Sequence, residues 1–580
     1  MDTPEHASFL TACEGLEYAL NRVDFPVETR NVASGRLMRD RLIGQVRDYF
    51  LPRARHLESP LTMVVGGSTG AGKSTLVNSL RRATVSASGV ARPTTRRPVL
   101  VHRAEDTAWM GPDRLLPHMP RVEHGSTKSG NDDQELEVCV SDAAPGGIAL
   151  IDAPDLDSVS DDNRRLSRQL LEAADVWLFV TTANRYADAV PWAVLERAAE
   201  RRIAVAGVLN RVPAGGGAEI LADLRRLLAE KGLHPTLTVS ISEQERDERG
   251  MLPESAVEGL RSWLDALGRD AEARADIAAS SLAGAVDALD ADLAALQETV
   301  REQHEALEQL EHDVVAAQEA ARKNIVDSMS DGALLRGEVL TRWQEFVGTG
   351  EWFRRLENGV GRVRDKLGNY LRGNPRRAER IESELESGLF RVIVEETATA
   401  VEDAHRAWYR DPAGRGLLGG DDLGHLPSDF SDRTQEEIRA WQQGIMTMMS
   451  TDGAGKRQRA RFLSMGLNTA AVVLMIVVFS ATGGLTGIEV GIAGGTGVVG
   501  LKLLEAIFGE DAVRRMAEQA RSDLVKRIDG LLDEAMEAFR ARLPETEDAV
   551  RVVAETRQRM AAAGRELRSR ERHVKKGGRE

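Results

Sequence analysis

Residues 63–77 decide the fold, and they read Met63-Val64-Val65-Gly66-Gly67-Ser68-Thr69-Gly70-Ala71-Gly72-Lys73-Ser74-Thr75-Leu76-Val77. An apolar strand, a glycine-rich turn and the start of a helix follow one another, and Gly67 to Ser74 fit the pattern G-x-x-x-x-G-K-[ST]. In such a turn the backbone N–H groups and the helix N-terminus face phosphate oxygens. A chance glycine-rich turn is the alternative, but the strand and helix beside it favour a phosphate-binding loop.

The motif predicts roles for individual side chains. Lys73 should reach the β- and γ-phosphates of a nucleotide, and the Ser74 hydroxyl should bind Mg²⁺. The predicted nucleotide contacts in the loop are Gly67, Ser68, Thr69, Gly70, Ala71, Gly72, Lys73, Ser74 and Thr75. Downstream, the apolar run Ile148–Asp152 ends in a carboxylate, and Asp152 is predicted to hold Mg²⁺ through water. Capping of a turn is the alternative role for Asp152.

Strand and helix patterns alternate from residue 61 to about residue 268. The predicted strands are Leu61–Val65, Val99–His102, Leu136–Val140, Ile148–Asp152, Val176–Thr181, Ile203–Leu209 and Thr236–Ile241. Helices are predicted near 73–83, 162–174, 188–201, 217–232 and 254–268. Because crossover helices cover both faces of a sheet, this alternation predicts an α/β domain with a mostly parallel sheet.

Composition limits the classes of partner and compartment. The 580 residues carry a formal net charge of -15, which argues against nucleic-acid binding. Only two cysteines, Cys13 and Cys139, are present, so no disulfide framework or cysteine metal site is expected, and a reducing compartment fits. The acidic N-terminus has no apolar core of a secretory signal.

The remainder of the chain predicts long helices. Apolar residues follow heptad spacing at Leu282, Val286, Leu289, Leu293, Leu296, Val300, Leu307, Leu310, Val314, Ala317 and Ala321, with Gln303 at one polar seam position. Such a seam requires a partner helix, either within the chain or, as the less favoured alternative, in another molecule. The segment Asp411–Phe430 is rich in Gly, Pro and Asp and predicts a loop.

A long apolar segment predicts membrane insertion. Phe462–Ala481 contains no charged residue, and its twenty residues would span about 30 Å as a helix. A second apolar stretch, Leu485–Leu501, follows with glycine every fourth residue and one carboxylate, Glu489. Four basic residues precede the first stretch and predict a cytoplasmic flank: Lys456, Arg457, Arg459 and Arg461. The expectation is a transmembrane hairpin on the cytoplasmic side of the cell membrane, with a hairpin buried in the helical stalk as the alternative.

These patterns predict five regions. They are N-terminal helices packing with the stalk (1–57), the nucleotide domain (58–268), a helical stalk (269–455), a basic flank with the hairpin (456–508), and a C-terminal stalk helix with a basic tail (509–580).

The motifs around the loop resemble a known family. Thr95-Arg96-Arg97-Pro98 is similar to the switch I signature of dynamin-type GTPases, and Gly66-Gly67 and Asp152-x-Pro154 are also dynamin-like. The wider run, with Asp152–Asp155 and Asn184–Asp188, resembles actinobacterial dynamin-like GTPases. The resemblance at the level of motifs covers about residues 60–245. It implies a GTP-hydrolysing enzyme that uses Mg²⁺, associates with itself through its GTPase domain and stalk, and acts on a lipid bilayer.

The resemblance also implies roles for site residues. Thr95 should bind Mg²⁺ in the triphosphate state and help to hold the attacking water. Thr69 and Gly70 stand where dynamins have the Gln-Ser pair that orients water, and Asp155 replaces the glycine of Asp-x-Pro-Gly. Asn210 and Arg211 match the start of the base-reading motif, although Pro213 replaces its aspartate.

A proline side chain cannot accept the guanine N–H groups, so weaker discrimination is expected and ATP is not excluded. Two other functions remain open at this stage. One is a P-loop switch that binds a protein or ribosomal partner. The other is an ATPase of the ATP-binding-cassette type, which lacks its usual signature sequence here.

Overall fold

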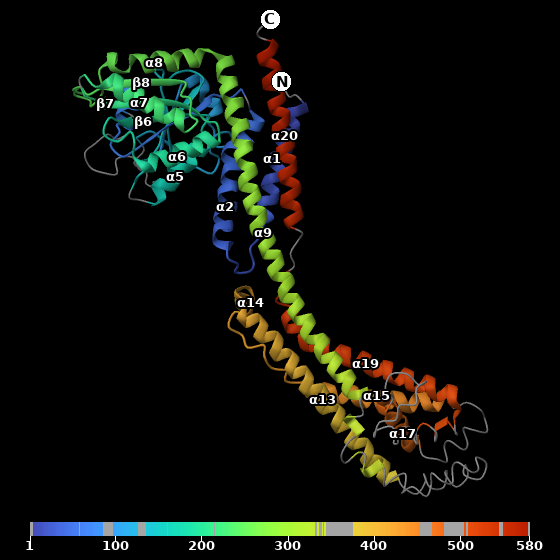
Figure 1. The fold of residues 1–580 in the computed structure, drawn as a ribbon. Coiled ribbons are helices and arrows are strands. Elements are labelled where there is room, and N and C mark those ends of the chain that lie inside the picture. The colour runs from blue at the N-terminus through green and yellow to red at the C-terminus, as the bar shows by residue number, and fades with distance from the viewer. Residues whose placement is uncertain are drawn as a thin grey trace, which may run out of the picture. The chain divides into compact units, whose positions relative to one another are not determined.

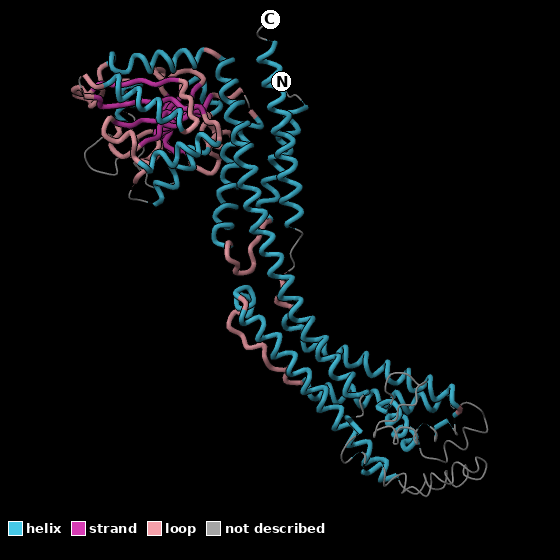
Figure 2. Tube along the Cα trace, viewed as in Figure 1, coloured by secondary structure: helices cyan, strands magenta, loops and turns pink. Residues whose placement is uncertain are grey.

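The computed structural model of the chain describes residues 4–56, 58–84, 97–125, 135–158, 161–213, 215–330, 333–335, 339, 341–343, 375–452, 467–480, 501, 504–505, 508–544 and 549–577. The chain divides into two compact units. Unit 1 comprises residues 1–25, 30–302 and 546–580, and unit 2 comprises residues 26–29 and 303–545. Strands gather in unit 1, whereas the described part of unit 2 is helical (Figure 2).

An eight-stranded sheet forms the centre of the nucleotide domain in unit 1 (Figure 1). The strands are β1 Leu61–Gly67, β2 Val99–His102, β3 Arg121–Glu123, β4 Leu136–Val140, β5 Ile148–Asp152, β6 Val176–Thr182, β7 Ala204–Val212 and β8 Leu237–Ser242. Their order is β3-β4-β2-β5-β1-β6-β7-β8. Every neighbouring pair is parallel except β2 and β5, which confirms the mostly parallel sheet. The short strand β3 was not predicted from the sequence.

Helices cover both faces of this sheet. Successive side chains of a strand point to opposite faces, so a strand that is apolar at every position needs cover on both. Met63 and Val65 pack with helices α4 (Lys73–Arg81) and α8 (Glu254–Arg269). Val64 packs on the other face, with α5 (Asp161–Glu172), α6 (Ala189–Glu200) and α7 (Gly217–Glu230). A 3-10 turn, η2, spans Ala104–Trp109.

The N-terminal helices of unit 1 form a second apolar cluster. They are α1 Pro4–Arg22, α2 Val32–Gln45, the π-helical turn η1 Val46–Phe50 and α3 Leu51–Arg55. Phe9 and Leu16 of α1 pack with Leu289 of α9 (Ala271–Ser330) and with Met560 of α20 (Ala549–Gly577). The first and last helices of the chain therefore share one core.

Asp175, buried just before β6, connects these helices to the sheet. Its carboxylate pairs with Arg53 and accepts hydrogen bonds from the Thr62 backbone N–H (2.7 Å) and the Tyr49 hydroxyl (3.3 Å). The Ser281 hydroxyl of α9 donates to the Asp175 carbonyl at 2.8 Å. A buried carboxylate needs such partners, since an unpaired charge in the interior is costly. Helices that precede and follow the nucleotide domain in the sequence are thus bonded to the residue that leads into β6.

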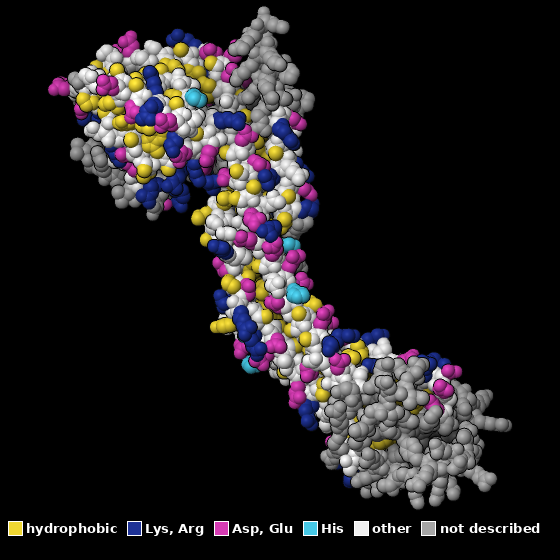
Figure 3. All heavy atoms as spheres, viewed as in Figure 1, with side chains coloured by type: hydrophobic (Ala, Val, Ile, Leu, Met, Phe, Trp, Pro, Cys, Tyr) yellow, Lys and Arg dark blue, Asp and Glu magenta, His cyan; other side chains and the backbone are white. Residues whose placement is uncertain are grey.

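Unit 2 is a helical bundle around an apolar core. Besides the later part of α9 it contains the turn η4 Ala333–Leu335 and the helices α13 Pro375–Arg410, α14 Pro412–Leu418, α15 Phe430–Asp452, α17 Leu467–Ser480 and α19 Glu510–Arg540. Two fully buried tryptophans anchor the core: Trp408 Nε1 donates to the Leu310 carbonyl (3.0 Å) and Trp441 Nε1 to the Ala520 carbonyl (2.8 Å). On the face drawn in Figure 3, acidic and basic side chains alternate over the described helices, and ion pairs such as Arg322–Asp529 (2.7 Å) join α9 to α19.

The heptad seam of α9 packs within this chain. Leu282 to Val300 lie in the cluster with the N-terminal helices, and Leu307 to Ala321 lie in the core of unit 2. Gln303, at the polar seam position, is 3% exposed. Its amide donates to the Val27 carbonyl (2.9 Å) and accepts from the Val27 N–H (3.1 Å), so the buried polar group is satisfied.

The predicted transmembrane hairpin and the membrane location based on it are wrong. Helix α17 has 14 residues, which span about 21 Å at about 1.5 Å per residue, well short of about 30 Å. Its side chains from Ala470 to Phe479 are at most 7% exposed and pack with α13, α15 and α19. Among the residues described, no helix is both long and apolar enough to cross a bilayer. The buried alternative holds for 467–480, while residues 453–466 and 481–500, including Glu489, lie outside the described residues.

The predicted loop Asp411–Phe430 contains helix α14. The Asp411 carboxylate caps its N-terminus by accepting from the Ala413 N–H at 2.7 Å, and Pro412 occupies the first turn. Gly419 ends the helix in the left-handed conformation, at φ +61°. The first of the residues that indicated a loop therefore cap a short helix, and residues 419–429 form the predicted loop.

Candidate nucleotide-binding site

Four parallel strands bring their carboxyl ends to one edge of the sheet. Strands β5, β1, β6 and β7 are neighbours and parallel, so the segments that follow them meet there. These segments are the phosphate loop after β1, residues 153–158 after β5 and residues 183–188 after β6, while β7 carries Asn210 near its end. Strand β2 runs antiparallel to β5 and begins at Val99, which pairs with Asp152. Strand β2 therefore begins at the same edge of the sheet.

The phosphate loop turns directly from β1 into α4. A Cβ atom on Gly67 would lie 2.0 Å from the Val180 carbonyl oxygen of β6, so only glycine fits there. Gly72 has φ +92° and precedes the first residue of α4, and a Cβ atom there would lie 2.4 Å from Asn210 Nδ2. The loop and the N-terminus of α4 thus have the strand-loop-helix geometry that binds phosphate.

Lys73 lies within the loop and is paired with a carboxylate. The side chain is 4% exposed, and its ammonium group donates to the Gly67 carbonyl (3.1 Å) and forms an ion pair with Asp155. Asp155 stands at the position where the resemblance has glycine. A nucleotide phosphate that bonds to Lys73 would compete with the Asp155 carboxylate for this ammonium group. The sequence motif Asp152-Ala153-Pro154-Asp155 located this residue but did not predict its partner.

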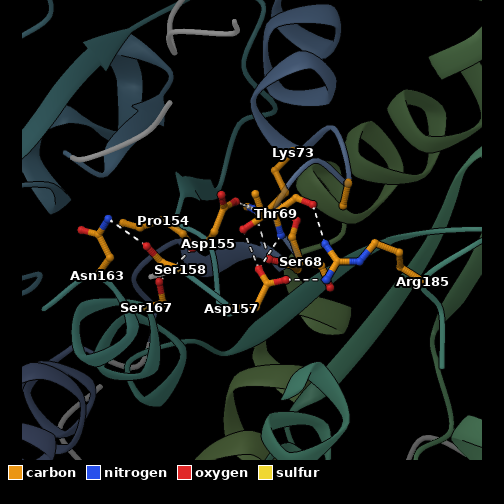
Figure 4. Close-up of polar contacts among 12 residues, drawn as sticks. Ser68, Thr69, Lys73, Pro154, Asp155, Asp157, Ser158, Asn163, Ser167 and Arg185 are labelled. Carbon is orange, nitrogen blue, oxygen red and sulfur yellow. Dashed lines mark hydrogen bonds and ion pairs between the residues drawn. The ribbon is translucent and has the colours of Figure 1, made fainter. Parts of the chain in front are cut away.

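A second carboxylate of the same segment binds Thr69 (Figure 4). Asp157 Oδ1 accepts from the Thr69 N–H (2.6 Å) and hydroxyl (2.7 Å), and Oδ2 accepts from Arg185 (2.7 Å). Burial acts to raise the pKa of Asp157, but the bonds from Thr69 and Arg185 outweigh it and hold that pKa below the usual value. No role of its own was assigned to Arg185 from the sequence, because its partners Thr69 and Asp157 are distant along the chain.

Asn210 connects the predicted base-reading segment to the phosphate loop. Its side-chain amide donates to the Ala71 carbonyl at 2.8 Å, and its oxygen accepts from the Arg211 N–H at 3.0 Å. Arg211 has a left-handed backbone, at φ +55°, and its side chain is exposed. The structure thus brings Asn210 to the loop.

The donor atoms at this edge fit Mg²⁺. Asp152 is fully buried at the end of β5, and Ser74 is the second residue of α4, which contacts both β1 and β5. A carboxylate and a hydroxyl are the hard oxygen ligands that Mg²⁺ prefers, and the ion takes its other ligands from phosphate and water. In the described part of the chain no three His, Cys, Asp or Glu side chains form an all-protein metal site. Thr95 lies outside the described residues.

Comparison with known families identifies the domain. Residues 63–211 match the model of the dynamin family. This match confirms the predicted dynamin-like P-loop GTPase domain and the prediction of a GTP-hydrolysing enzyme. The narrower resemblance to actinobacterial proteins stays a prediction. No curated protein matches the chain.

Solved structures are similar only at a low level. A single-residue variant of Era from Aquifex aeolicus, bound to GDP·AlF4⁻, is 20% identical over 35% of this chain, with a TM-score of 0.23. The chain covers 56% of that protein. Two structures of an oligomerised bacterial dynamin pair, described as a mechanism for long-range sensing and tethering of membranes, are 9% and 11% identical. The first match covers 96% of this chain and 95% of the matched chain, with a TM-score of 0.33. The second covers 94% of this chain and 96% of the matched chain, with a TM-score of 0.32. Scores of this size do not identify a fold.

Proposed function

We propose that this chain binds GTP with Mg²⁺ at the carboxyl edge of its sheet and uses hydrolysis to control its association with a second copy and with a lipid surface. The observation that carries the nucleotide part is Lys73, a buried cation in a phosphate loop that is paired with the Asp155 carboxylate. Such a lysine offsets the charge of the β- and γ-phosphates. In this proposal the triphosphate takes the place of Asp155.

The other site residues receive roles that follow the chemistry of their groups. Ser74 binds Mg²⁺ directly and Asp152 binds it through water, while Thr95 completes the metal site and holds the attacking water. Thr69 positions the loop, and Asn210 and Arg211 contact the base side of the nucleotide. Bound Mg²⁺ would neutralise charge on the phosphate oxygens.

The proposal also includes self-association and lipid binding. The dynamin-family match supports them, and the Asp175 contacts offer a physical link from the sheet to helices α3 and α9. A change at the nucleotide edge of β6 would reach these helices through a rigid strand of seven residues. Lipid contact is proposed here as peripheral binding to a bilayer.

The test uses the purified full-length protein. The rates of GTP and ATP hydrolysis are measured first. Sedimentation of the protein with anionic liposomes is then measured under three conditions: with a non-hydrolysable GTP analogue, with GDP, and without nucleotide. We expect GTP turnover, and more protein in the liposome pellet with the GTP analogue than with GDP. Lys73→Ala is the control that should remove the nucleotide dependence. If liposome sedimentation and oligomeric state were the same with the GTP analogue, with GDP and without nucleotide, the proposal would be contradicted. That result would favour a switch that binds a separate protein.

A further inference from the structure

Arg185 reaches the phosphate loop from the turn between β6 and α6. Its Nη1 donates to the Thr69 carbonyl at 2.8 Å, and its Nη2 donates to the Asp157 carboxylate at 2.7 Å. Its Nε donates to Asp188 at 2.7 Å, which orients the guanidinium plane. The side chain is 39% exposed, so the group lies at the opening of the site. Arg185 and Lys73 are thus two cations that both bond to carbonyl groups of the loop.

The groups that surround the Asp157 carboxylate are those of an anion site. They are a backbone N–H of the phosphate loop, the Thr69 hydroxyl and the guanidinium of Arg185, with bonds of 2.6 to 2.7 Å. Backbone N–H groups of such loops and arginine side chains also bind phosphoryl oxygens. The Asp157 carboxylate therefore lies where an oxygen of the nucleotide could bind. Two residues earlier, Asp155 forms an ion pair with Lys73.

We propose that Arg185 is a catalytic residue supplied by the same chain, and that it donates to a γ-phosphoryl oxygen of GTP in place of Asp157. The inference deepens the proposed function and rests on it. In hydrolysis the water oxygen bonds to the γ-phosphorus, and the bond from that phosphorus to the β–γ bridging oxygen breaks. Its electron pair stays on GDP, and the water proton passes to the released phosphate.

The chemistry of arginine suits this role. Negative charge on the γ-phosphoryl oxygens and the bridging oxygen is redistributed in the transition state, and a fixed cation stabilises that state more than the ground state. The planar guanidinium can keep one N–H on the Thr69 carbonyl while another turns to the phosphoryl group. A lysine cannot make both bonds in one plane. Asp188 keeps the guanidinium oriented when Asp157 leaves.

The experiment separates catalysis from binding in the full-length chain. Arg185→Ala and Arg185→Lys are compared with wild type for kcat at saturating GTP, for the Kd of GDP, and for GDP binding in the presence of aluminium fluoride, which mimics the transferring phosphoryl group. In other GTPases an arginine in this role raises kcat by a factor of about 10³–10⁵. We expect kcat to fall at least about 100-fold in both variants, GDP affinity to change less than threefold, and the gain in affinity from aluminium fluoride to disappear.

Arg226→Ala is the matched control, because Arg226 lies on α7 with two carboxylate partners, Asp223 and Glu230, on the exposed surface. It should hydrolyse GTP at the wild-type rate. An unchanged kcat in Arg185→Ala would overturn the inference, as would a parallel loss of GDP binding and kcat, which indicates a role in the shape of the loop. If wild type itself does not hydrolyse GTP, the proposed function fails instead.

A second variant tests the exchange with Asp157. Asp157→Asn keeps the size of the side chain but removes the charge that holds Arg185, so Arg185 is freed for the phosphoryl group and kcat should rise above the wild-type value. A fall in kcat as large as that of Arg185→Ala would place the catalytic requirement on Asp157 and overturn the assignment to Arg185.

Discussion

Strand β6 and helix α17 each contain a continuous apolar run that is buried in the protein, Val176–Val180 in the strand and Ala470–Phe479 in the helix. From Val176 to Val180 the strand is fully buried between helices on both faces of the sheet. The side chains of α17 from Ala470 to Phe479 are at most 7% exposed and pack among α13, α15 and α19. The membrane span that the sequence predicted here is wrong, whereas the strand was predicted correctly. An apolar run shows only that a segment avoids water, and a protein core meets that need as well as lipid does.

The two regions also differ in how they use charge. Strand β6 lies between Asp175 and the turn that carries Arg185, and these residues form buried or half-buried contacts with distant segments. The core of unit 2 is held mainly by apolar side chains, with tryptophan N–H groups bonded to backbone carbonyls. Substitutions should therefore act on stability in unit 2 and on nucleotide affinity at the sheet edge.

The largest expected effect is from a charge in α17. Leu474 is fully buried, and Leu474→Asp should destabilise unit 2 by roughly 4 kcal/mol or more, because it removes packing and buries an unpaired carboxylate. Thermal unfolding followed by circular dichroism gives the measurement. Val315→Asp is the control, since Val315 of α9 is 37% exposed. Equal unfolding temperatures for Leu474→Asp and wild type would show that this face of α17 is not in a protein core.

At the sheet edge, Lys73→Ala should weaken GTP binding by about 100-fold or more, since hydrogen bonds to charged groups contribute about 1.5–3 kcal/mol each. Titration calorimetry with a GTP analogue measures this loss. Lys231→Ala removes an exposed lysine that pairs with Glu196 and should bind as wild type does. Wild-type affinity in Lys73→Ala would refute the assignment of the phosphate loop.

Asp155→Asn should raise the affinity for GTP, whereas Lys73→Ala lowers it. The phosphate would no longer displace a carboxylate from Lys73, so GTP affinity should rise by about tenfold, or about 1.4 kcal/mol. The same titration measures the gain, with Asp162→Asn on the exposed surface of α5 as the control. Weaker binding in Asp155→Asn would mean that this carboxylate assists the nucleotide.

The smallest expected effect concerns the cap of α14. Asp411→Ala removes the hydrogen bond to the Ala413 N–H and should cost about 1 kcal/mol of unfolding free energy. Urea unfolding measures it, and Asp327→Ala, an exposed change on α9, is the reference. No shift in the urea midpoint relative to that reference would mean that the cap contributes no stability.

Much of the α/β fold followed from the sequence because its signals are local. Each predicted strand is present, and the phosphate loop has its strand and helix. The antiparallel direction of β2 was not accessible, since it depends on pairing with β5 rather than on the residues of β2. The loop predicted at Asp411–Phe430 is present over residues 419–429, but the sequence missed α14 for a related reason: Asp, Pro and Gly favour both turns and helix ends.

The site was predicted only as far as motifs reach. Lys73, Ser74 and Asp152 were found from the phosphate-loop pattern, and Asn210 from the resemblance to a base-reading motif. The structure brings these residues to one edge of the sheet. The pairing of Lys73 with Asp155 and of Arg185 with Thr69 spans 82 and 116 residues, so no local pattern indicates it. The roles of Thr95 and of the metal ligands stay predictions.

The packing of α1 against α20 has a consequence for the way the chain is made. Helix α1 leaves the ribosome long before Val553 and Met560 of α20, which pack in one core with Phe9 and Leu16 on the apolar face of α1. At about 5–20 residues per second, the intervening chain takes on the order of half a minute to two minutes to synthesise. During that interval the face of α1 that will meet α20 is open to water, to α9 once it emerges, and to any chaperone that binds apolar helices. Translation speed, rather than the intrinsic rate of helix formation, therefore sets when unit 1 can be completed.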